Sequence, residues 1–182
     1  MNKEEVNYRH ERTIPFYEET IQRSFSSKLI KIKNTLLLFI AYICPSVKLR
    51  IICHKLRGVN IGRNCYIGMF CFIDNLYPEY VYFGDNTSLN NGSKLIAHFN
   101  PSSRFEGLFE AKVSPIIIKN GAMIAVNCVI LPGVTLGEYA VISAGSIVSK
   151  SVEAYTLVQG NPARKVINFK HLLKKIPEMD NN

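Results

Sequence analysis

The sequence lacks several features that mark common classes of protein. None of its hydrophobic runs reaches the ~18 residues that a membrane-spanning helix needs, and the longest, residues 36–44, ends at Pro45. Its five cysteines include no C-x-x-C pair of the kind used in zinc and redox sites. The N-terminal segment is too polar and too acidic for a signal peptide. These absences predict a cytoplasmic protein with free thiols.

Acidic residues are missing from one long stretch. The chain of 182 residues has 22 Lys and Arg against 14 Asp and Glu, a formal net charge of +8. No Asp or Glu occurs between Thr20 and Ile73, whereas the basic residues there are Arg23, Lys28, Lys31, Lys33, Lys48, Arg50, Lys55, Arg57 and Arg63. The rest of the chain is close to neutral. Such an excess fits nucleic acid, an anionic membrane or acidic substrates, and the charge balance alone does not choose among them.

Length and composition predict one globular domain with extensions. A chain of 182 residues is long enough for one sizeable hydrophobic core and rarely for two. Hydrophobic residues make up 47% and charged residues 20%, which is typical of globular proteins and argues against a wholly disordered chain.

Aliphatic residues recur every six positions in the C-terminal half. The positions are Ile118, Ile124, Ile130, Leu136, Ile142 and Val148. The same spacing runs through residues 61–73 and again through residues 83–95. The phase breaks by four residues between 73 and 83 and by five between 95 and 118. We interpret each break as a loop that leaves a repeating structure.

A period of six fits neither an α-helix, which repeats every three or four residues, nor a flat strand, which alternates every two. It fits short strands wound so that three hexapeptides close one triangular coil, here called the prism. Each aliphatic side chain then points inward and stacks on its neighbour 18 residues away, and the ends of the stack need caps. Cys65, Cys71 and Cys128 occupy small inward positions, so we expect them to fill the core and not to react.

The pattern divides the chain into three predicted regions. Residues 1–57 form a basic, helical N-terminal extension in which Pro45 separates two short helices. Residues 58–156 form the prism, with a protruding loop at 98–115. Residues 157–182 form a turn at Gly160 followed by a basic C-terminal helix.

The segment IIIKNGAMIAVNCVILPGVTLGEYAVISAGSIVSKSVEAYTLVQGNPARKV resembles the hexapeptide-repeat acyltransferases, in particular the maltose and galactoside O-acetyltransferase branch. LPGVTLG, SAGSIVSK and GNPA carry the resemblance, which covers about residues 59–168. With its basic N-terminal segment, RGVNIG and YPEYVYFGDN, the chain is most similar to sugar O-acetyltransferases of bacterial surface-polysaccharide synthesis. The resemblance implies an all-β, left-handed parallel β-helix with a helical N-terminal extension and a short C-terminal helix.

The implied activity is transfer of an acetyl group from acetyl-CoA to a hydroxyl of a sugar or glycan. That reaction needs a general base near neutral pH and donors for the developing oxyanion. Of the four histidines, His98 lies where the repeat gives way to the long loop, the point at which related enzymes carry their catalytic histidine. The resemblance therefore implies that His98 is the general base.

The resemblance also suggests residues for the acceptor sugar. Arg104 follows His98 shortly, as an acceptor-site arginine does in the family, although its spacing differs by one residue. Glu110, five residues before Pro115, would orient His98 or bind a sugar hydroxyl. Where the galactoside enzymes have an acceptor-binding Asn, this chain has FCFID, so Asp74 is the candidate substrate-binding residue and a different acceptor is expected.

Acetyl-CoA is implied to lie in a groove between two prisms of a homotrimer, and no metal is implied. Val126, Ser143 and Ala144 would contact its pantetheine arm, where small residues allow close approach. Met123 stands where the family usually has a Trp. The expected cations for the phosphates are Lys150, Arg164 and Lys165.

Other functions remain open at the level of sequence. A γ-class carbonic anhydrase shares this architecture but needs three histidines around a metal, and the repeats contain only His98. An N-acyltransferase of an amino sugar or a serine O-acetyltransferase would use the same base and donor. A non-catalytic scaffold is the alternative from another class.

The basic stretch suggests where in the cell the protein acts. Residues 20–73 combine the apolar run LLLFIAY with lysines, a pattern that favours an anionic membrane surface over nucleic acid. We therefore expect peripheral contact with the inner face of the cell membrane and no nucleic-acid partner.

Overall fold

The computed structural model describes residues 8–14 and 25–175. Residues 20–24, the start of the stretch expected to contact a membrane, and residues 176–182, the end of the predicted C-terminal region, lie outside the described residues.

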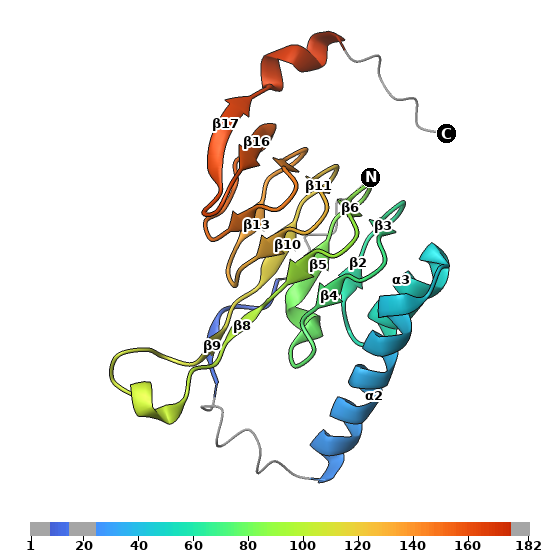
Figure 1. Ribbon diagram of the computed structural model, residues 1–182, viewed down its shortest axis with the longest axis vertical. Coiled ribbons are helices and arrows are strands. Elements are labelled where there is room, and N and C mark those ends of the chain that lie inside the picture. Colours follow the sequence, from blue (N-terminus) through green and yellow to red (C-terminus); the bar gives the residue numbers. More distant parts are fainter. Residues whose placement is uncertain (1–7, 15–24, 176–182) are drawn as a thin grey trace.

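Three parallel sheets form the faces of the prism (Figure 1). The first contains β2 (Asn60–Ile61), β5 (Val81–Phe83), β10 (Ile116–Ile118) and β13 (Thr135–Leu136). The second contains β3 (Tyr66–Ile67), β6 (Ser88–Leu89), β11 (Met123–Ile124), β14 (Val141–Ile142) and β16 (Thr156–Gln159). The third contains β4 (Phe72–Ile73), β7 (Lys94–Leu95), β12 (Val129–Ile130) and β15 (Ile147–Val148).

The register of these sheets confirms the predicted period. Ile118 pairs with Leu136, 18 residues on, as three hexapeptides per coil require. Phe83 pairs with Ile61 and Ile118, at offsets of 22 and 35 residues. The larger offsets are one coil plus an inserted loop, so both phase breaks in the sequence correspond to loops.

Aliphatic side chains fill the prism. Those at the repeat positions are almost completely buried: Ile67, Ile73, Leu89, Leu95, Ile124, Ile130, Leu136 and Ile142. Burial of one such side chain contributes about 1.5–3 kcal/mol. Cys71 and Cys128 are buried beside them, and burial raises the pKa of both thiols, which agrees with a packing role.

Most turns of the coil have a residue in the left-handed backbone region, three places after the inward aliphatic. Asn64, Asn86 and Asn127 have φ of 52°, 57° and 57°, glycines occupy the same place in four other turns, and Phe70 and Tyr139 occupy it in two. Asn and Gly tolerate this conformation best. At Gly137 the next coil is so close that a Cβ would lie 2.3 Å from the amide nitrogen of Ala154.

Two helices separated at Pro45 cover the first coil, as the sequence predicts (Figure 1). They are α2 (Phe25–Ile43) and α3 (Val47–Leu56). The hydroxyl of Ser46 caps α3 by accepting a hydrogen bond from the amide of Leu49 at 3.4 Å. Buried Arg50 fastens α3 to the prism, because its Nε donates to the carbonyl of Ile67 at 2.7 Å.

A small antiparallel sheet projects from the prism. Its strands, in order, are β1 (Arg12–Thr13), β9 (Lys112–Val113) and β8 (His98–Phe99). The loop between β8 and β9 contains the 3-10 helix η2 (Ser103–Phe105). The predicted helical extension did not include β1, because the partner strand of this short segment lies about 100 residues away.

The C-terminal prediction was wrong in part. The segment expected to be helical contains β17 (Arg164–Asn168), which pairs antiparallel with β16. A hairpin through Gly160 lets β17 satisfy the backbone groups at the open edge of β16, which a helix would leave unpaired. Up to residue 175, where the described part of the chain ends, β17 is followed by η3 (Lys170–Lys175), a 3-10 helix.

Candidate active site

A hydrogen-bonded pair of side chains lies where two loops leave the prism. His98 begins β8, and Asp74 follows β4. The His98 Nδ1 and Asp74 Oδ2 atoms are 2.6 Å apart. The side chain of Asp74 is 0% exposed and that of His98 22% exposed, so only the imidazole reaches the surface.

Backbone amides hold the Asp74 carboxylate in place. Its Oδ1 accepts from Leu76 N at 2.9 Å and Tyr77 N at 3.0 Å, and its Oδ2 also accepts from Ala97 N at 2.8 Å. Burial by itself would raise the pKa of Asp74, but the hydrogen bond and charge of His98, together with these amides, lower the pKa below its usual value. An ionised Asp74 favours a proton on His98 Nδ1 and leaves Nε2 as an acceptor.

Arg57, the residue that follows α3, holds the backbone at Asp74 and so supports the His98–Asp74 pair. One guanidinium nitrogen, Nη2, donates to the carbonyl oxygens of Ile73 at 2.7 Å and Asp74 at 2.6 Å. The other, Nη1, lies 3.0 Å from His54 Nδ1. Burial lowers the pKa of Arg57 to about 10, against the opposing effect of the Asp74 charge, so Arg57 is cationic at neutral pH.

His54 is buried beside two cations. Burial first, then the charges of Arg57 and Arg50, lower its pKa to about 3. Neutral His54 can therefore accept the hydrogen bond from Arg57. Neither His54 nor Arg57 was predicted as a functional residue, because no sequence motif links them to His98.

Asp74 and Glu110 lie in different surroundings from those that their expected roles imply. Asp74, expected to bind the acceptor, is fully buried, and both of its oxygens are used inside the protein. Glu110, expected to orient His98, is exposed in the loop, as is Arg104. Among the described residues, the carboxylate bonded to His98 is that of Asp74.

The sequence pattern indicates that Asp74 and His98 lie close together. Ile73 and Leu95 are the last repeat positions before the two phase breaks, and these residues pair between β4 and β7. The two loops therefore leave the prism side by side, which brings together the residues that follow each strand.

The residues expected to contact pantetheine lie on neighbouring turns. Gly145 N donates to the carbonyl of Val126 at 2.9 Å, which places the turn of Ser143 and Ala144 against that of Val126. Met123 and Val126 are exposed, so this surface is open to a ligand.

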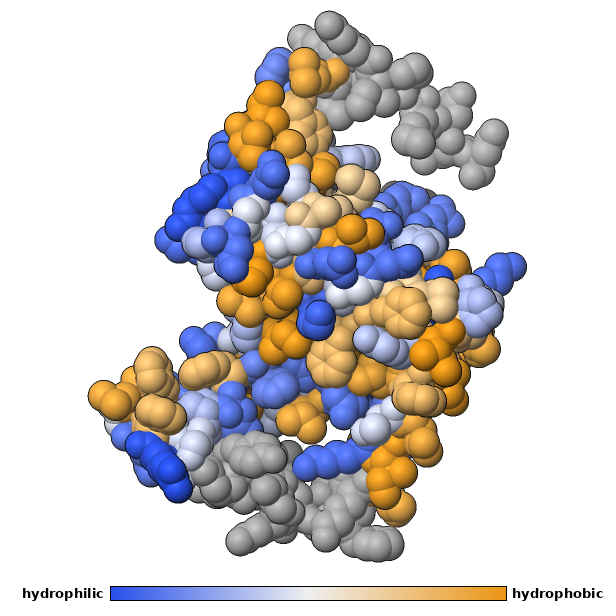
Figure 2. All heavy atoms as spheres, in the orientation of Figure 1, coloured by the Kyte–Doolittle hydropathy of each residue, from blue (hydrophilic) through white to orange (hydrophobic). Residues whose placement is uncertain are grey.

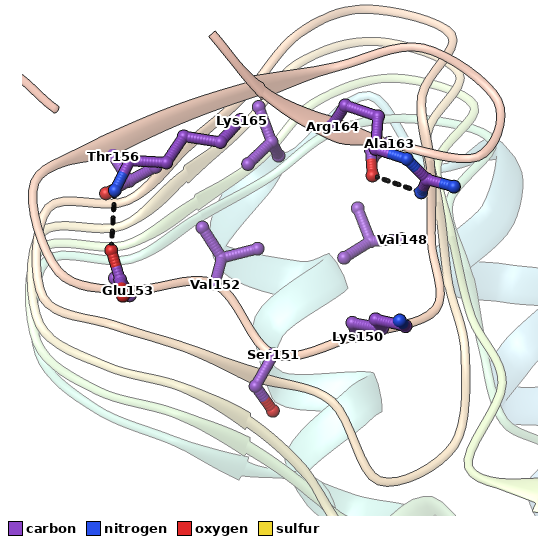
Figure 3. Close-up of a pocket in the computed structure, with 10 residues that line it drawn as sticks. Val148, Lys150, Ser151, Val152, Glu153, Thr156, Ala163, Arg164 and Lys165 are labelled. Atoms are coloured by element: carbon purple, nitrogen blue, oxygen red, sulfur yellow. Dashed lines mark hydrogen bonds and ion pairs between the residues drawn. The ribbon is translucent and has the colours of Figure 1, made fainter. Parts of the chain in front are cut away.

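The three expected phosphate-binding cations line a cavity of about 370 Å³ at the C-terminal end of the prism (Figure 3). Its floor includes Val148 and Val152. Figure 3 shows Lys150 and Arg164 on one side of the cavity and the end of Lys165 on the other, where Lys165 Nζ pairs with Glu153 at 2.8 Å. The side chains of Arg164 and Lys165 therefore point to opposite sides of the cavity. In the part of the chain that the structure describes, no group of three or more His, Cys, Asp and Glu residues could hold a metal ion.

Comparisons with known proteins identify the repeat. Residues 115–150 match the family model described as bacterial transferase hexapeptide (six repeats). The chain is 28% identical over 147 residues to "Putative acetyltransferase YvoF" of Bacillus subtilis, covering 80% of this chain and 81% of YvoF. It is 50% identical over 48 residues to a dTDP-3-amino-3,6-dideoxy-alpha-D-galactopyranose 3-N-acetyltransferase of Aneurinibacillus thermoaerophilus, covering 26% of this chain and 25% of that protein.

Solved structures share the fold. The hexapeptide-repeat acetyltransferase VCA0836 of Vibrio cholerae has a TM-score of 0.68 at 21% identity, covering 81% of this chain and 94% of that chain. A galactoside acetyltransferase in complex with coenzyme A has a TM-score of 0.62 at 19% identity, covering 88% and 94%. These neighbours imply that the coil is a left-handed β-helix.

Proposed function

Because the chain belongs to the hexapeptide-repeat transferase family, we propose that it is an acetyl-CoA-dependent O-acetyltransferase acting on a sugar or glycan hydroxyl, with His98 as general base. The names of its relatives and the coenzyme A complex of a structural neighbour support an acetyltransferase that binds acetyl-CoA. The observation that carries the finer proposal is the partly exposed His98 held by buried Asp74.

In the proposed mechanism, Asp74 keeps the proton of His98 on Nδ1, so Nε2 takes the proton of the acceptor hydroxyl as its oxygen attacks the acetyl carbon. Acetyl-CoA supplies a thioester that is already activated. The imidazolium formed on His98 is stabilised by the Asp74 carboxylate, and it returns the proton to the departing thiolate sulfur. His98 thus ends each cycle neutral.

The donor would lie along the exposed turns of Met123, Val126, Ser143 and Ala144, in a groove shared with a second prism of a homotrimer. Lys150 and Arg164 are the cations best arranged for its phosphates, since they line the same side of the terminal cavity and neither forms an ion pair among the described residues. Lys165 is exposed but already paired with Glu153.

The test is a His98→Ala variant assayed with labelled acetyl-CoA and a panel of soluble and lipid-linked glycans, read by mass spectrometry. Loss of a general base reduces acetyl transfer by about 10²–10⁴-fold. Acetyl-CoA should still raise the melting temperature of this variant, because His98 is not assigned to donor binding.

Arg164→Ala is the complementary variant, in which acetyl-CoA should raise the melting temperature by less than in the wild type. Full transfer activity in His98→Ala would contradict the assignment of the base. The absence of any thermal response of the wild type to saturating acetyl-CoA would favour a scaffold.

An N-acyltransferase of an amino sugar is the second candidate, favoured by the 50% identity to an N-acetyltransferase over 48 residues. The same base and donor site would serve an amine. Amino-sugar acceptors belong in the same panel, and acetylation of the amine with no transfer to hydroxyls would decide for this function. A serine O-acetyltransferase is tested by including serine.

A role in surface-polysaccharide synthesis would bring the enzyme to the membrane, and α2 and α3 offer a surface for that contact. Their exposed apolar residues are Leu29, Ile30, Ile32, Leu36, Phe39, Ile40, Ile43, Leu49, Ile52 and Leu56. In Figure 2 this apolar surface follows the position of α2. Within the described residues, no helix is long and apolar enough to cross a membrane. We propose that this face, with Lys33, Lys48 and Lys55 beside it, rests on an anionic membrane surface.

A further inference from the structure

The N-terminal strand β1 places a positively charged residue, Arg12, on the face of the small sheet that carries His98. In the small sheet, Val113 pairs with His98 on one side and with Arg12 on the other. Side chains of directly paired residues project from the same face of a sheet. Strands lie about 4.8 Å apart, so the backbones of Arg12 and His98, two strands apart, are about 10 Å from each other.

Two buried tyrosines connect these residues. The Tyr77 ring centroid is 5.5 Å from that of His98 and 6.0 Å from the Cζ atom of Arg12. The Tyr80 ring centroid is 5.8 Å from Arg12 Cζ and 5.7 Å from Arg9 Cζ. Because both tyrosines are buried, they form a fixed platform on which two guanidinium groups are held by cation–π contacts.

Within residues 8–14 and 25–175, the carboxylates near the two arginines are bonded to other groups. Glu11 lies between them in the chain, but its carboxylate pairs with Lys112 at 3.4 Å and accepts a hydrogen bond from the Ser114 hydroxyl. Asp74 is bonded to His98. Among the residues that the structure describes, Arg9 and Arg12 form no ion pair with a carboxylate, and both are exposed, so their donors can reach a ligand.

We propose that Arg9 and Arg12 bind an anionic group of the acceptor, so that the substrate is a phosphorylated or acidic sugar and not a neutral one. The inference rests on the proposed function, because it places the reacting hydroxyl at His98 Nε2. The anionic group then lies about one sugar ring away, over Tyr77 and Tyr80. Guanidinium groups recognise phosphate and carboxylate through paired, charge-assisted hydrogen bonds.

The kinetic test compares a glycosyl phosphate, a glycuronic acid methyl glycoside and a neutral methyl glycoside with the same hydroxyl free. The wild type should use one of the anionic acceptors with a kcat/KM at least about 10-fold above that of the neutral one, as expected for loss of a hydrogen bond to a charged group. The acceptor that gains identifies the anion as phosphate or carboxylate. Equal use of all three would overturn the inference while leaving the proposed acetyl transfer intact.

The variants Arg12→Gln and Arg9→Gln, alone and combined, should raise KM for the anionic acceptor with little change in kcat, and should leave the neutral acceptor unaffected. Arg12→Lys should restore part of the preference, because it keeps the charge but not the forked donors. Lys119→Gln, which removes an exposed cation at the turn after β10, is the charge-matched control and should behave as the wild type. An unchanged preference in the double variant would overturn the inference.

A binding measurement keeps the inference testable if no sugar is acetylated. Inorganic pyrophosphate should bind the wild type and Lys119→Gln by calorimetry in the presence of coenzyme A, and should bind the double arginine variant at least about 10-fold more weakly. Equal affinities would overturn the inference. Failure of acetyl transfer together with a normal arginine effect would instead count against the proposed function.

Discussion

The hydrogen bond between His98 and Asp74 determines which imidazole nitrogen is available for chemistry. Asp74 accepts from three backbone amides as well as from His98, so its position does not depend on the histidine alone. A carboxylate fixed in this way stabilises the imidazolium that forms when His98 takes a proton. The exposed Glu110 has no comparable constraint.

Asp74→Asn should lower kcat by about 10²-fold or more, because the uncharged amide neither enforces the tautomer nor stabilises the imidazolium. Glu110→Gln is the matched carboxylate-to-amide control and should keep kcat within about 3-fold, a change worth less than 1 kcal/mol. Both are measured with saturating acetyl-CoA and the best acceptor. A larger loss in Glu110→Gln than in Asp74→Asn would reverse the assignment.

At the scale of elements, α3 is a support for the active site as well as a cap. Arg57 connects the end of the helix to the carbonyl groups of Ile73 and Asp74, while Arg50 connects its first turns to Ile67. His54 completes the arrangement as a neutral acceptor for Arg57. Buried charges of this kind are stable only with such partners, so the docking of α3 and the position of Asp74 depend on each other.

The depressed pKa of His54 predicts that the protein loses stability in acid. Between pH 6.5 and a folded-state pKa of about 3, the unfolded chain binds a proton at His54 that the folded chain does not. The free energy of unfolding should therefore fall as the pH drops below 6.5, by on the order of 3 kcal/mol at pH 4 from this group.

The measurement is urea denaturation followed by circular dichroism from pH 7.5 to pH 4. His54→Gln should be less stable than the wild type at pH 7 but should show a shallower loss in acid. His171→Gln, at an exposed histidine, should keep the wild-type slope. Parallel slopes for wild type and His54→Gln would contradict a buried neutral His54.

At the scale of the whole molecule, the proposed donor site, the proposed membrane surface and the His98 site lie at different places along the prism. The cavity with Lys150 and Arg164 lies at the C-terminal end, whereas α2 and α3 cover the N-terminal end (Figure 1). The His98 site lies where the small sheet projects from the prism. If α2 and α3 hold the enzyme at a membrane, a membrane-linked acceptor would reach His98 without passing the end of the prism that we assign to the phosphates of acetyl-CoA.

The membrane proposal predicts that the protein floats with phosphatidylglycerol vesicles at low salt and less with phosphatidylcholine vesicles. Each lysine near an anionic surface contributes about 1 kcal/mol, and salt should weaken the binding. Replacing Leu36, Phe39 and Ile40 together by Gln should abolish flotation, since it removes the exposed apolar face of α2.

Val166→Gln, at an exposed position of β17, is the control for a general loss of surface hydrophobicity and should float as the wild type does. No flotation of the wild type with anionic vesicles would end the membrane proposal, as would equal flotation of the triple variant.

The architecture of the prism follows from the amino-acid pattern alone. A bulky aliphatic every six residues can be buried only by coils of 18, so the strands, their register and both loop exits follow from the pattern. It also located His98 at the exit of a loop. Asn or Gly at most of the left-handed turn positions belongs to the same pattern.

The residues that surround His98 come together through folding and could not be found from a local motif. Asp74 is 24 residues away, Arg57 caps the C-terminus of α3, and Arg12 lies on a strand paired with a segment about 100 residues later. Local propensity carries no information about such contacts, because they arise from how loops and extensions fold back on the prism. The six-residue period alone determines which side chains form the core. The residues of the candidate active site lie where that period is interrupted.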